Sequence, residues 1–532
     1  RVQAQNVDTR LSIEFHRRFQ ELRTGSPISI DWTLIWKGKG QPRGHLEVQI
    51  LDGQKELGTL RTVNEQVLTA SGNRFRTLLP TYFPEEVLAP LDIQAYFVSD
   101  EGRFDLGERS LRVAGASRRT FIVAFCDSWQ QIIADDEREE LSDSLDLKKF
   151  VVASQQKHLA TYPARVFPTD ISPDPLWLCE YNIVVLLPDG FRELRTAQLE
   201  GLARWVDAGG SLCVFLAGTL TRPHIEFLNG LTRAPLDRPL VSLDATGRAM
   251  CATPIVRSTR GLGHVVVTNA DPHSEQFIAS QDWKASTSFL WKRLAGQRQS
   301  PPDVFRKNRQ RRKTTTDRPL AADPASVDLS SRDRKLPPSV AITWRLTTLG
   351  SLLARLTPED FEVVPLWLLG CLLVGYLVVI GPVDYFLLGL FRQRRLTWLF
   401  FPLVTLGLAV TIVWISHDYM GTNQGSKSVI FRDLGDRGEV VRENRFELLL
   451  NAMPTTEETR VRRALFTPID HRRFLAETDS VSDDPFSRVA LEPGQPTHYI
   501  GTIPADFIAV QETPQWSPQL NRIFEITPRD PA

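Results

Sequence analysis

The pattern of apolar and polar positions changes several times along the chain. From about residue 8 to 115, short runs such as "ISIDWTLIW", "HLEVQILDG" and "DIQAYFVSD" alternate apolar and polar positions, with turn residues between them. Period-two alternation interrupted by turns at this spacing is typical of a β-sandwich. The sequence therefore predicts an N-terminal β-sandwich over residues 1–116, in which no group of residues has a catalytic pattern.

After Arg119 the apolar runs become continuous. "TFIVAFCD", "NIVVLLPDG", "SLCVFLAG" and "GHVVVTNA" read as strands buried on both faces, with a helical region between the first two. A helix also precedes the third run, with Thr196 as its expected N-cap and Gly209-Gly210 at a left-handed C-terminus. Strands that alternate with helices predict a parallel α/β sheet over residues 117–295, covered on both sides.

The remaining soluble segments are less regular. Residues 296–339 are rich in Pro, Ser, Thr and charged side chains, and their composition predicts a linker whose basic run "RKNRQRRK" is solvated. Residues 340–362 have apolar positions at helical spacing, which predicts an amphipathic helix at the membrane interface or packed on protein. Residues 417–532 return to short β-like runs and predict a second, smaller β-domain.

Two long apolar stretches predict a membrane hairpin. Residues 363–391 contain one charge, Asp384, and residues 396–416 contain none. A helix needs about 20 apolar residues to cross the hydrocarbon core of a bilayer. We therefore expect two transmembrane helices that anchor the chain in a bilayer.

The loop at 392–395 between these stretches carries three arginines, Arg392, Arg394 and Arg395. Such a loop is expected on the cytoplasmic side of a membrane. The basic run in the linker favours the opposite orientation. It lies about 50 residues from the first span, however, beyond the range where this rule acts strongly, so the short loop is the stronger signal. The sequence therefore predicts a protein of the inner (cytoplasmic) membrane whose N- and C-terminal domains are both extracytoplasmic.

A carboxylate within a span is a functional candidate by default, and Asp384 lies in "GPVDYF". A structural role is the favoured interpretation, because Asp384 is close to the arginine loop. It can lie near the headgroups, cap a kink at Pro382, or pair with Arg392 or Arg394. A hairpin with one such charge makes a poor channel, so anchoring is the simpler role.

Charge and cysteine content exclude several classes of function. Lysine plus arginine equals aspartate plus glutamate, 63 each, so no overall positive field draws in nucleic acid. The five cysteines form no C-x-x-C pair, so no metal site, redox motif or cofactor is expected. The chain begins with "RVQAQN", and we expect either that a signal segment was removed before it or that the N-terminus is incomplete.

The stretch "ARWVDAGGSLCVFLAGTL" resembles the class I glutamine amidotransferase fold, in which a helix ending in glycines precedes a strand that ends in G-x-C-x-G. In that family the cysteine sits on a strained elbow, and a downstream His-x-Glu supplies the base and its orienting partner. Of the elbow's residues only Gly218 is present here, and Leu216 occupies the nucleophile position. The resemblance implies that amide hydrolysis by the family mechanism cannot run in this chain.

Three residues remain as candidates for a pocket. Asp127 and Asp189 follow the first two buried strands, at the edge where α/β folds place ligands. His273 lies in "PHSE", an echo of His-x-Glu after a later strand. Their alternative interpretation, as turn and cap residues, is the favoured one. Cys213 lies within its strand, on a different face from Leu216, so it is not expected to replace the missing nucleophile.

The order of segments also resembles a group of bacterial membrane proteins with an inactive amidotransferase-like domain. In that group a β-domain and the α/β domain precede a two-span hairpin with the motif GPxDY, and a further β-domain follows. Here the motif is "GPVDY", residues 381–385, and "ALFTP", residues 464–468, resembles a motif of the final domain. The resemblance implies an envelope protein and does not imply a chemistry.

Three functions therefore stay open. The first is a non-catalytic, membrane-anchored scaffold that binds other membrane or periplasmic proteins. The second is an envelope hydrolase that uses Asp127, Asp189 and His273 at the sheet edge. The third is a sensor in which the former pocket binds a small molecule and the hairpin transmits the signal.

Overall fold

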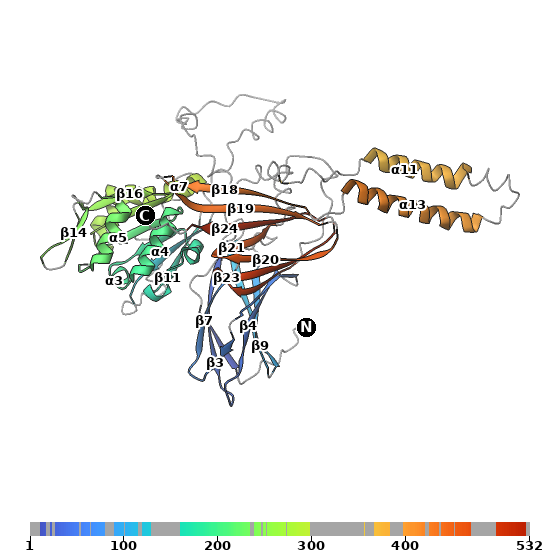
Figure 1. Ribbon diagram of the computed structural model, residues 1–532. Helices are drawn as coiled ribbons and strands as arrows, with labels where there is room; N and C mark the ends of the chain where they lie inside the picture. Colours follow the sequence, from blue (N-terminus) through green and yellow to red (C-terminus); the bar gives the residue numbers. More distant parts are fainter. Residues whose placement is uncertain are drawn as a thin grey trace, which may run out of the picture.

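Figure 1 shows the chain as a computed structural model, with an α/β body, two groups of strands beside it and a helical hairpin. The structure describes Leu356 and residues within the ranges 11–128, 160–297, 366–383, 397–420, 425–469 and 496–527. Gaps inside these ranges fall at residues 17–21, 24–26, 53–54, 64, 80–89, 101, 115–119, 217, 235–238, 246–247, 252, 273, 436–437, 452 and 516.

The α/β body contains the parallel sheet that the sequence predicts. Its strands lie in the order β11 (Ala160–Val166), β10 (Thr120–Cys126), β12 (Ile183–Leu186), β13 (Ser211–Phe215), β17 (Gly263–Thr268) and β16 (Ile255–Arg260). The pairs from β11 to β17 are parallel, and β16 is antiparallel to β17. Every residue of β12 and β13 is buried, as expected of central strands with both faces covered.

Helices cover both faces of this sheet. Side chains from α4 (Thr196–Asp207) and α5 (Arg222–Thr232) join the apolar cluster on one face, which contains Val184 and Val214. Trp283 and Leu290 of α7 (Gln281–Gln297) join the cluster on the other face, around Phe125 and Phe215. The parallel sheet with two covered faces is thus confirmed.

The ends of α4 explain the motif "RWVDAGG". The prediction that Thr196 is the N-cap is wrong by one residue, because Arg195 has extended dihedrals and its N–H donates to Oε1 of Gln198 at 2.8 Å. Gly209 has a φ of +114°, which a side chain would disfavour. An added Cβ on Gly210 would lie 2.3 Å from the ring of Trp205, so this glycine makes room for the buried indole.

Strand β11 lies where the sequence analysis expects part of a helical region. It forms the edge of the sheet and contains Pro163 and Arg165, so it lacks the continuous apolar run that marks the central strands. Proline is tolerated at an edge because one side of the strand has no ladder to complete. The predicted helical region is therefore wrong for residues 160–166, which form this edge strand. Residues 129–159, the rest of that region before β11, lie outside the described part of the chain.

The predicted runs "ISIDWTLIW", "HLEVQILDG" and "DIQAYFVSD" lie in strands of the N-terminal part, which also contains strands that the sequence did not predict. Strands β1 (Leu11–His16), β3 (Ile28–Trp36) and β7 (Asn73–Leu79) form one sheet. A second sheet contains β2 (Leu22–Arg23), β9 (Gly102–Ala114), β8 (Pro90–Ser99), β4 (Arg43–Asp52) and β5 (Lys55–Arg61), with β6 (Gln66–Val67) beside β4. Trp36 of β3 meets Phe104 of β9 edge to face, with ring centroids 5.7 Å apart, so the two sheets pack together.

The C-terminal strands are divided between two sheets. Strands β18 (Gly425–Leu434), β19 (Val440–Leu450), β24 (Gln519–Ile526) and β21 (Ala464–Ile469) form a sheet of their own. Strands β22 (Thr497–Thr502), β23 (Asp506–Thr513) and β20 (Thr455–Arg462) extend the second N-terminal sheet. The joining pair is parallel and runs from Thr497 opposite Gly58 to Ile500 opposite Arg61. One sheet is therefore built from both ends of the chain.

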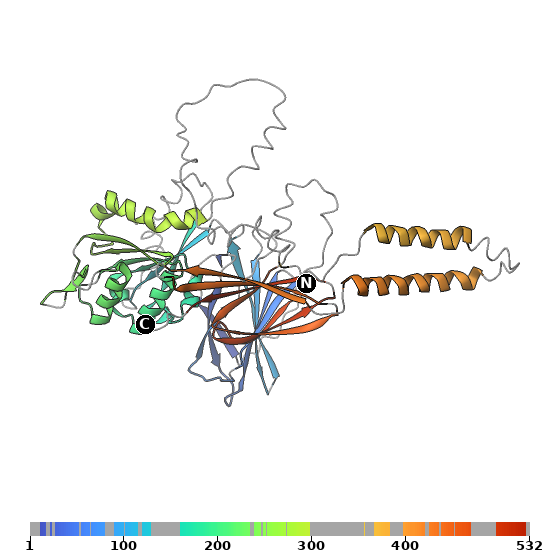
Figure 2. The same ribbon diagram turned by 45° about the horizontal axis from the view of Figure 1, so that its top comes forward.

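The hairpin segment projects away from the β-strands, as Figures 1 and 2 show. Its first arm is α11 (Leu366–Val378) followed by a π-helical turn η4 (Val379–Val383), and its second arm is α13 (Thr397–Met420). Among the helices that the structure describes, none is long and apolar enough to cross a membrane. Many apolar side chains on both arms are exposed, among them Trp367, Leu373, Leu377, Leu403, Leu406, Val410 and Trp414.

Leu356 is the described residue of the predicted amphipathic segment 340–362. Its side chain is fully buried in an apolar cluster with Phe446, Leu448 and Leu520 of the C-terminal sheet. At this position the segment therefore packs on protein, which was one of the two alternatives that the sequence left open. The other residues of the segment lie outside the described residues.

Candidate functional site

The carboxyl ends of β10, β12, β13 and β17 lie side by side at one edge of the parallel sheet. In α/β folds this edge is the usual place for ligands. Asp127 follows β10, and Asp189 follows β12 at the start of α3 (Pro188–Arg192). Leu216 follows β13, and Thr268 ends β17.

The structure brings Asp127 and Asp189 to the same part of this edge. The N–H of Leu187 donates to the carbonyl oxygen of Cys126 at 3.0 Å. An added Cβ on Gly190 would lie only 2.7 Å from the Cα of Asp127, so α3 presses closely on the end of β10. The backbone approach, and not a direct contact between the two carboxylates, is what holds the two acids near each other.

Both carboxylates have local partners. Asp127 is 6% exposed, and its Oδ1 accepts the N–H of Ser128 at 2.8 Å. Oδ1 of Asp189 lies 3.4 Å from Nη2 of Arg192, three residues further along α3. Each of these contacts is local, to a residue one or three positions further along the chain, and the interpretation of the two acids as turn and cap residues stays a prediction.

Leu216 is placed differently from a catalytic elbow residue. Its N–H donates to the carbonyl oxygen of Thr268 at 2.8 Å, so it continues the ladder with β17, and its side chain is 9% exposed. Gly218 is exposed, and its carbonyl oxygen accepts the N–H of Ala249 at 2.9 Å. No heavy atom lies within 4 Å of an added Cβ on Gly218, so packing does not require a glycine there.

The nearby thiols are buried. Cys213 is fully buried beside Val185 and Val266, and burial raises the pKa of its thiol well above the usual range. It belongs to the apolar cluster on the face opposite to that of Leu216, as the alternation of the strand predicts. Burial, followed by the charge of Asp127, also raises the pKa of Cys126. Neither sulfur is available as a thiolate nucleophile near neutral pH.

His224 is a polar residue at this edge that the sequence analysis missed. It lies in the first turn of α5, is 4% exposed, and its Nε2 lies 3.0 Å from the carbonyl oxygen of Phe191. Its Nδ1 lies 2.6 Å from Oγ1 of Thr221. Since a carbonyl oxygen only accepts, Nε2 carries the proton and Nδ1 accepts from the hydroxyl. Burial lowers the pKa of His224, so the neutral imidazole links α3 to α5.

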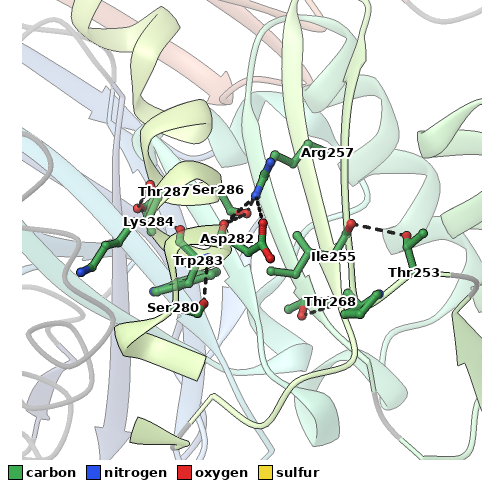
Figure 3. Close-up of polar contacts among 11 residues, drawn as sticks. Thr253, Ile255, Arg257, Thr268, Ser280, Asp282, Trp283, Lys284, Ser286 and Thr287 are labelled. Carbon is green, nitrogen blue, oxygen red and sulfur yellow. Dashed lines mark hydrogen bonds and ion pairs between the residues drawn. The ribbon is translucent and has the colours of Figure 1, made fainter. Parts of the chain in front are cut away.

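Polar groups beside the end of β17 are used within the fold. Figure 3 shows Arg257 of β16, whose Nε donates to Oγ of Ser286 at 2.9 Å and whose Nη2 donates to the carbonyl oxygen of Asp282 at 2.7 Å. Oγ1 of Thr268 donates to the carbonyl oxygen of Pro254 at 3.0 Å. His273, the third predicted pocket residue, lies outside the described residues, so its membership of the pocket stays a prediction.

The predicted hairpin residues are described only in part. Pro382 lies in the π-helical turn η4 and is exposed. Asp384, Arg392, Arg394 and Arg395 lie outside the described residues, so their pairing stays a prediction. Across the described ranges, no three His, Cys, Asp or Glu side chains gather as a metal site requires.

A short 3-10 helix, η3 (Pro175–Glu180), joins the α/β body to the N-terminal strands. Oε2 of Glu180, which is 1% exposed, accepts the N–H of Ser29 in β3 at 3.0 Å. The guanidinium of Arg76 in β7 lies 4.7 Å above the ring of Trp177. Nη2 of Arg74 lies 3.2 Å from a carboxylate oxygen of Asp31 and 3.2 Å from one of Asp170, and so bridges the two parts.

The C-terminal sheet contacts the α/β body on another side. Nη1 of Arg442 in β19 donates to the carbonyl oxygen of Ala208 at 3.0 Å, at the C-terminus of α4. A cation at this end of a helix also interacts favourably with the helix dipole. Asp433, 4% exposed on its side chain, pairs with the same guanidinium. Apolar residues of all three parts belong to one buried cluster, so the α/β body is fixed from two directions.

Comparisons with known proteins add little. No protein family matches the chain, and no curated sequence matches it. A β-glucosidase from Listeria innocua in complex with glucose is 12% identical, over 20% of this chain and 16% of that one, with a TM-score of 0.14. A cycloisomaltooligosaccharide glucanotransferase from Paenibacillus sp. is 11% identical, over 39% and 28%, with a TM-score of 0.17.

Cwp6 from Clostridium difficile is 9% identical, over 42% of this chain and 40% of that one, with a TM-score of 0.12. The chain thus spans less than half the length of each of these structures. Similarity at this level supports no statement about activity. The chain is a multidomain α/β protein with additional β-sheets and a mostly parallel sheet.

Proposed function

We propose that this chain is a non-catalytic, membrane-anchored scaffold, an extracytoplasmic interaction subunit of a bacterial cell-envelope complex. The observation that carries the proposal is Leu216. By the sequence resemblance, Leu216 falls at the position of the amidotransferase nucleophile, but it carries a hydrocarbon side chain on a backbone that stays paired with β17. The acids at the same edge of the sheet each have a local partner, and the thiols nearby are buried. An α/β sheet edge without a nucleophile at this position is suited to binding.

The anchor in this proposal is the hairpin. Its two long apolar stretches, which contain Asp384 as their one charge, and the exposed apolar side chains of α11 and α13 support insertion into a bilayer. Strand β22 comes after the hairpin in the sequence, and its partner β5 comes before the hairpin. The flanking parts therefore have to lie on the same side of any membrane that the hairpin enters, which requires two crossings. The arginine loop then faces the cytoplasm, and both flanking parts face the other compartment.

The scaffold role is supported by how the α/β body is held. Buried contacts at Glu180 and at Arg442 attach it to strands from both ends of the chain. An enzyme that closes over a substrate needs parts that move, whereas a scaffold benefits from a fixed arrangement of surfaces. The partners we infer are other membrane or periplasmic proteins.

The test is purification of the full chain from bacterial membranes in mild detergent. We expect stoichiometric partner proteins, with equal amounts for the wild type and for a variant that combines Asp127→Asn, Asp189→Asn and His273→Gln. We also expect no amide or ester turnover by the pure chain. Loss of cellular function in the triple variant, with folding and assembly intact, would replace the scaffold with a hydrolase. A monomer that carries a small molecule in the α/β body would replace it with a sensor.

Orientation is tested separately with Met250→Cys, an exposed position in the α/β body. A membrane-impermeant thiol reagent should label this cysteine in spheroplasts before lysis. Labelling only after lysis would place the α/β body in the cytoplasm and contradict the proposed orientation.

A further inference from the structure

We propose that two turns of the C-terminal strands form a second membrane contact beside the hairpin. The turn rim consists of Asn451, Met453 and Pro454, between β19 and β20, and of Pro514 and Gln515, between β23 and β24. We infer that this rim rests in the headgroup region of the bilayer. The inference depends on the proposed insertion of the hairpin.

Strand pairing places both turns at the end of the sheets from which the hairpin leaves. Gly425, the first residue of β18, lies opposite Leu450 at the end of β19. Thr455, the first residue of β20, lies opposite Thr513 at the end of β23. In Figure 1 these strand ends point toward α13, and the α/β body lies at the other end of the strands.

The distance to the hairpin is limited by the chain itself. Helix α13 ends at Met420 and β18 begins at Gly425. A fully extended chain covers at most about 3.6 Å per residue, so Gly425 lies within about 18 Å of the end of the helix. The rim therefore stays close to the membrane surface if α13 is inserted.

The composition of the two turns suits a lipid interface. Residues 451–456, "NAMPTT", and 513–519, "TPQWSPQ", contain no charged side chain, in a chain that is 24% charged. Met453 is 60% exposed, and Pro454, Pro514 and Gln515 are exposed as well. A single exposed methionine is ordinary on a soluble surface. Beside a membrane anchor, however, an uncharged tip can enter the headgroup layer without the cost of dehydrating a charge.

Hydrogen bonds join the residues that flank Met453 to the end of β23. Nδ2 of Asn451 donates to Oγ1 of Thr455 at 2.8 Å and to Oγ1 of Thr513 at 2.5 Å. Oγ1 of Thr513 in turn donates to the carbonyl oxygen of Thr455 at 2.9 Å. Asn451 and Thr513 are each 2% exposed, so the bond between them is shielded from water, whereas Thr455 is exposed. Both sides of the turn between β19 and β20 are thereby tied to the end of β23, which keeps the two turns of the rim together.

A hairpin alone would let the extracytoplasmic parts tilt relative to the bilayer. A second contact at the rim would restrict this tilt. The expected consequence is a fixed orientation in which the α/β body is held away from the bilayer, where partner proteins can reach it. Because the rim is uncharged, the contact should not depend on anionic lipids.

The experiment uses the full chain in which Cys179, Cys251 and Cys371 are replaced by serine. Cys126 and Cys213 can stay, because both are fully buried. An environment-sensitive fluorophore is attached to Met453→Cys, and in a matched control to Met250→Cys, which is similarly exposed at 54%. The proteins are reconstituted in vesicles of phosphatidylcholine, with and without phosphatidylglycerol, and with lipids spin-labelled at the headgroup.

We expect the probe at position 453 to be quenched by the spin-labelled lipid and protected from aqueous iodide, in both lipid mixtures. The probe at position 250 should show the opposite behaviour, which controls for the affinity of the fluorophore itself for lipid. If spin-labelled lipid quenches the probe at position 453 only in vesicles that contain phosphatidylglycerol, the contact depends on anionic lipid and the inference is overturned.

Two outcomes separate this inference from the proposed function. If the probe at 453 behaves like that at 250 while the chain resists alkaline extraction, the rim contact is wrong and the anchor stands. If alkali releases the chain from the vesicles, the anchor is wrong and the rim contact is lost with it.

Discussion

Gly190 provides a test of the close approach between α3 and β10 at the candidate site. An added Cβ at this position would lie 2.4 Å from the carbonyl oxygen of Cys126 and 2.7 Å from the Cα of Asp127. Both are backbone atoms, which cannot rotate away as the end of a side chain can. Gly190→Ala therefore forces α3 away from the end of β10.

The size of the effect follows from two opposing terms. Overpacking a close contact costs about 1–3 kcal/mol, and two backbone contacts favour the upper end of this range. Alanine regains up to about 1 kcal/mol because it is a better helix former than glycine. The expected net loss of local stability is about 2 kcal/mol, which corresponds to about a 30-fold change in an opening equilibrium.

Cys126 supplies the assay, because its thiol is fully buried and reacts only when the end of β10 opens. The labelling rate of Cys126 under native conditions, followed by mass spectrometry, should rise by about 30-fold in Gly190→Ala if labelling tracks the open population. Cys213, in the central strand β13, should change less and serves as an internal reference.

Gly218→Ala is the matched control at the same edge of the sheet, because an added Cβ there meets no heavy atom within 4 Å. Its effect should stay within about 0.5 kcal/mol, or about twofold in labelling rate. An unchanged labelling rate of Cys126 in Gly190→Ala, or an equal increase in Gly218→Ala, would refute the steric argument.

Three further predictions concern the links between parts of the fold. Burial lowers the pKa of His224, so its contribution to stability is complete above the ordinary pKa of about 6.5 and is lost as pH falls through the lower folded value. Thermal melts below about pH 6.5 should show an acid-dependent loss that His224→Gln lacks. Arg442→Gln leaves the buried Asp433 unpaired and frees the end of α4, at a cost of about 3–5 kcal/mol in denaturant unfolding. Arg432→Gln, at an ion pair whose arginine is 59% exposed, should cost at most about 1 kcal/mol, and equal effects of the two variants would contradict this account. Tyr499→Ala removes a fully buried ring beside Phe466 and Phe507 and should cost about 3–5 kcal/mol, with earlier proteolysis of the joined sheet. Ile500→Ala, at a side chain that is 39% exposed, should have little effect, and similar proteolysis of both variants would argue against the packing of β22.

Strand prediction from the sequence succeeded where burial leaves an unmistakable pattern. "IVVL" and "SLCVF" are the central strands β12 and β13, and they have to be apolar because both faces are covered. Edge strands carry mixed residues, so β11 was missed. In the C-terminal part, the sequence predicted β-like runs over residues 417–532 but not that their strands are divided between two sheets.

The candidate site was predictable in part. The position of Leu216 could be assigned from the motif alone, and Asp127 and Asp189 do follow adjacent strands. His224 was missed because its importance depends on the carbonyl oxygen of Phe191, which is distant in sequence and has no side-chain signal. The burial of Glu180 against Ser29 was missed for the same reason.

The sequence by itself determined which segments are apolar on one face, on both faces or throughout, because this information is local and repeats with the period of each element. It also determined that residue 216, which the resemblance aligns with the amidotransferase nucleophile, is a leucine, because this depends on the identity of one residue. Only the tertiary structure decided that β22 completes a sheet begun by β5, and that the α/β body is fixed between strands from both ends of the chain. Backbone N–H and C=O groups are nearly the same at every residue, so the sequence does not show which distant strands pair. The pairing depends on how the side chains of the whole chain pack together.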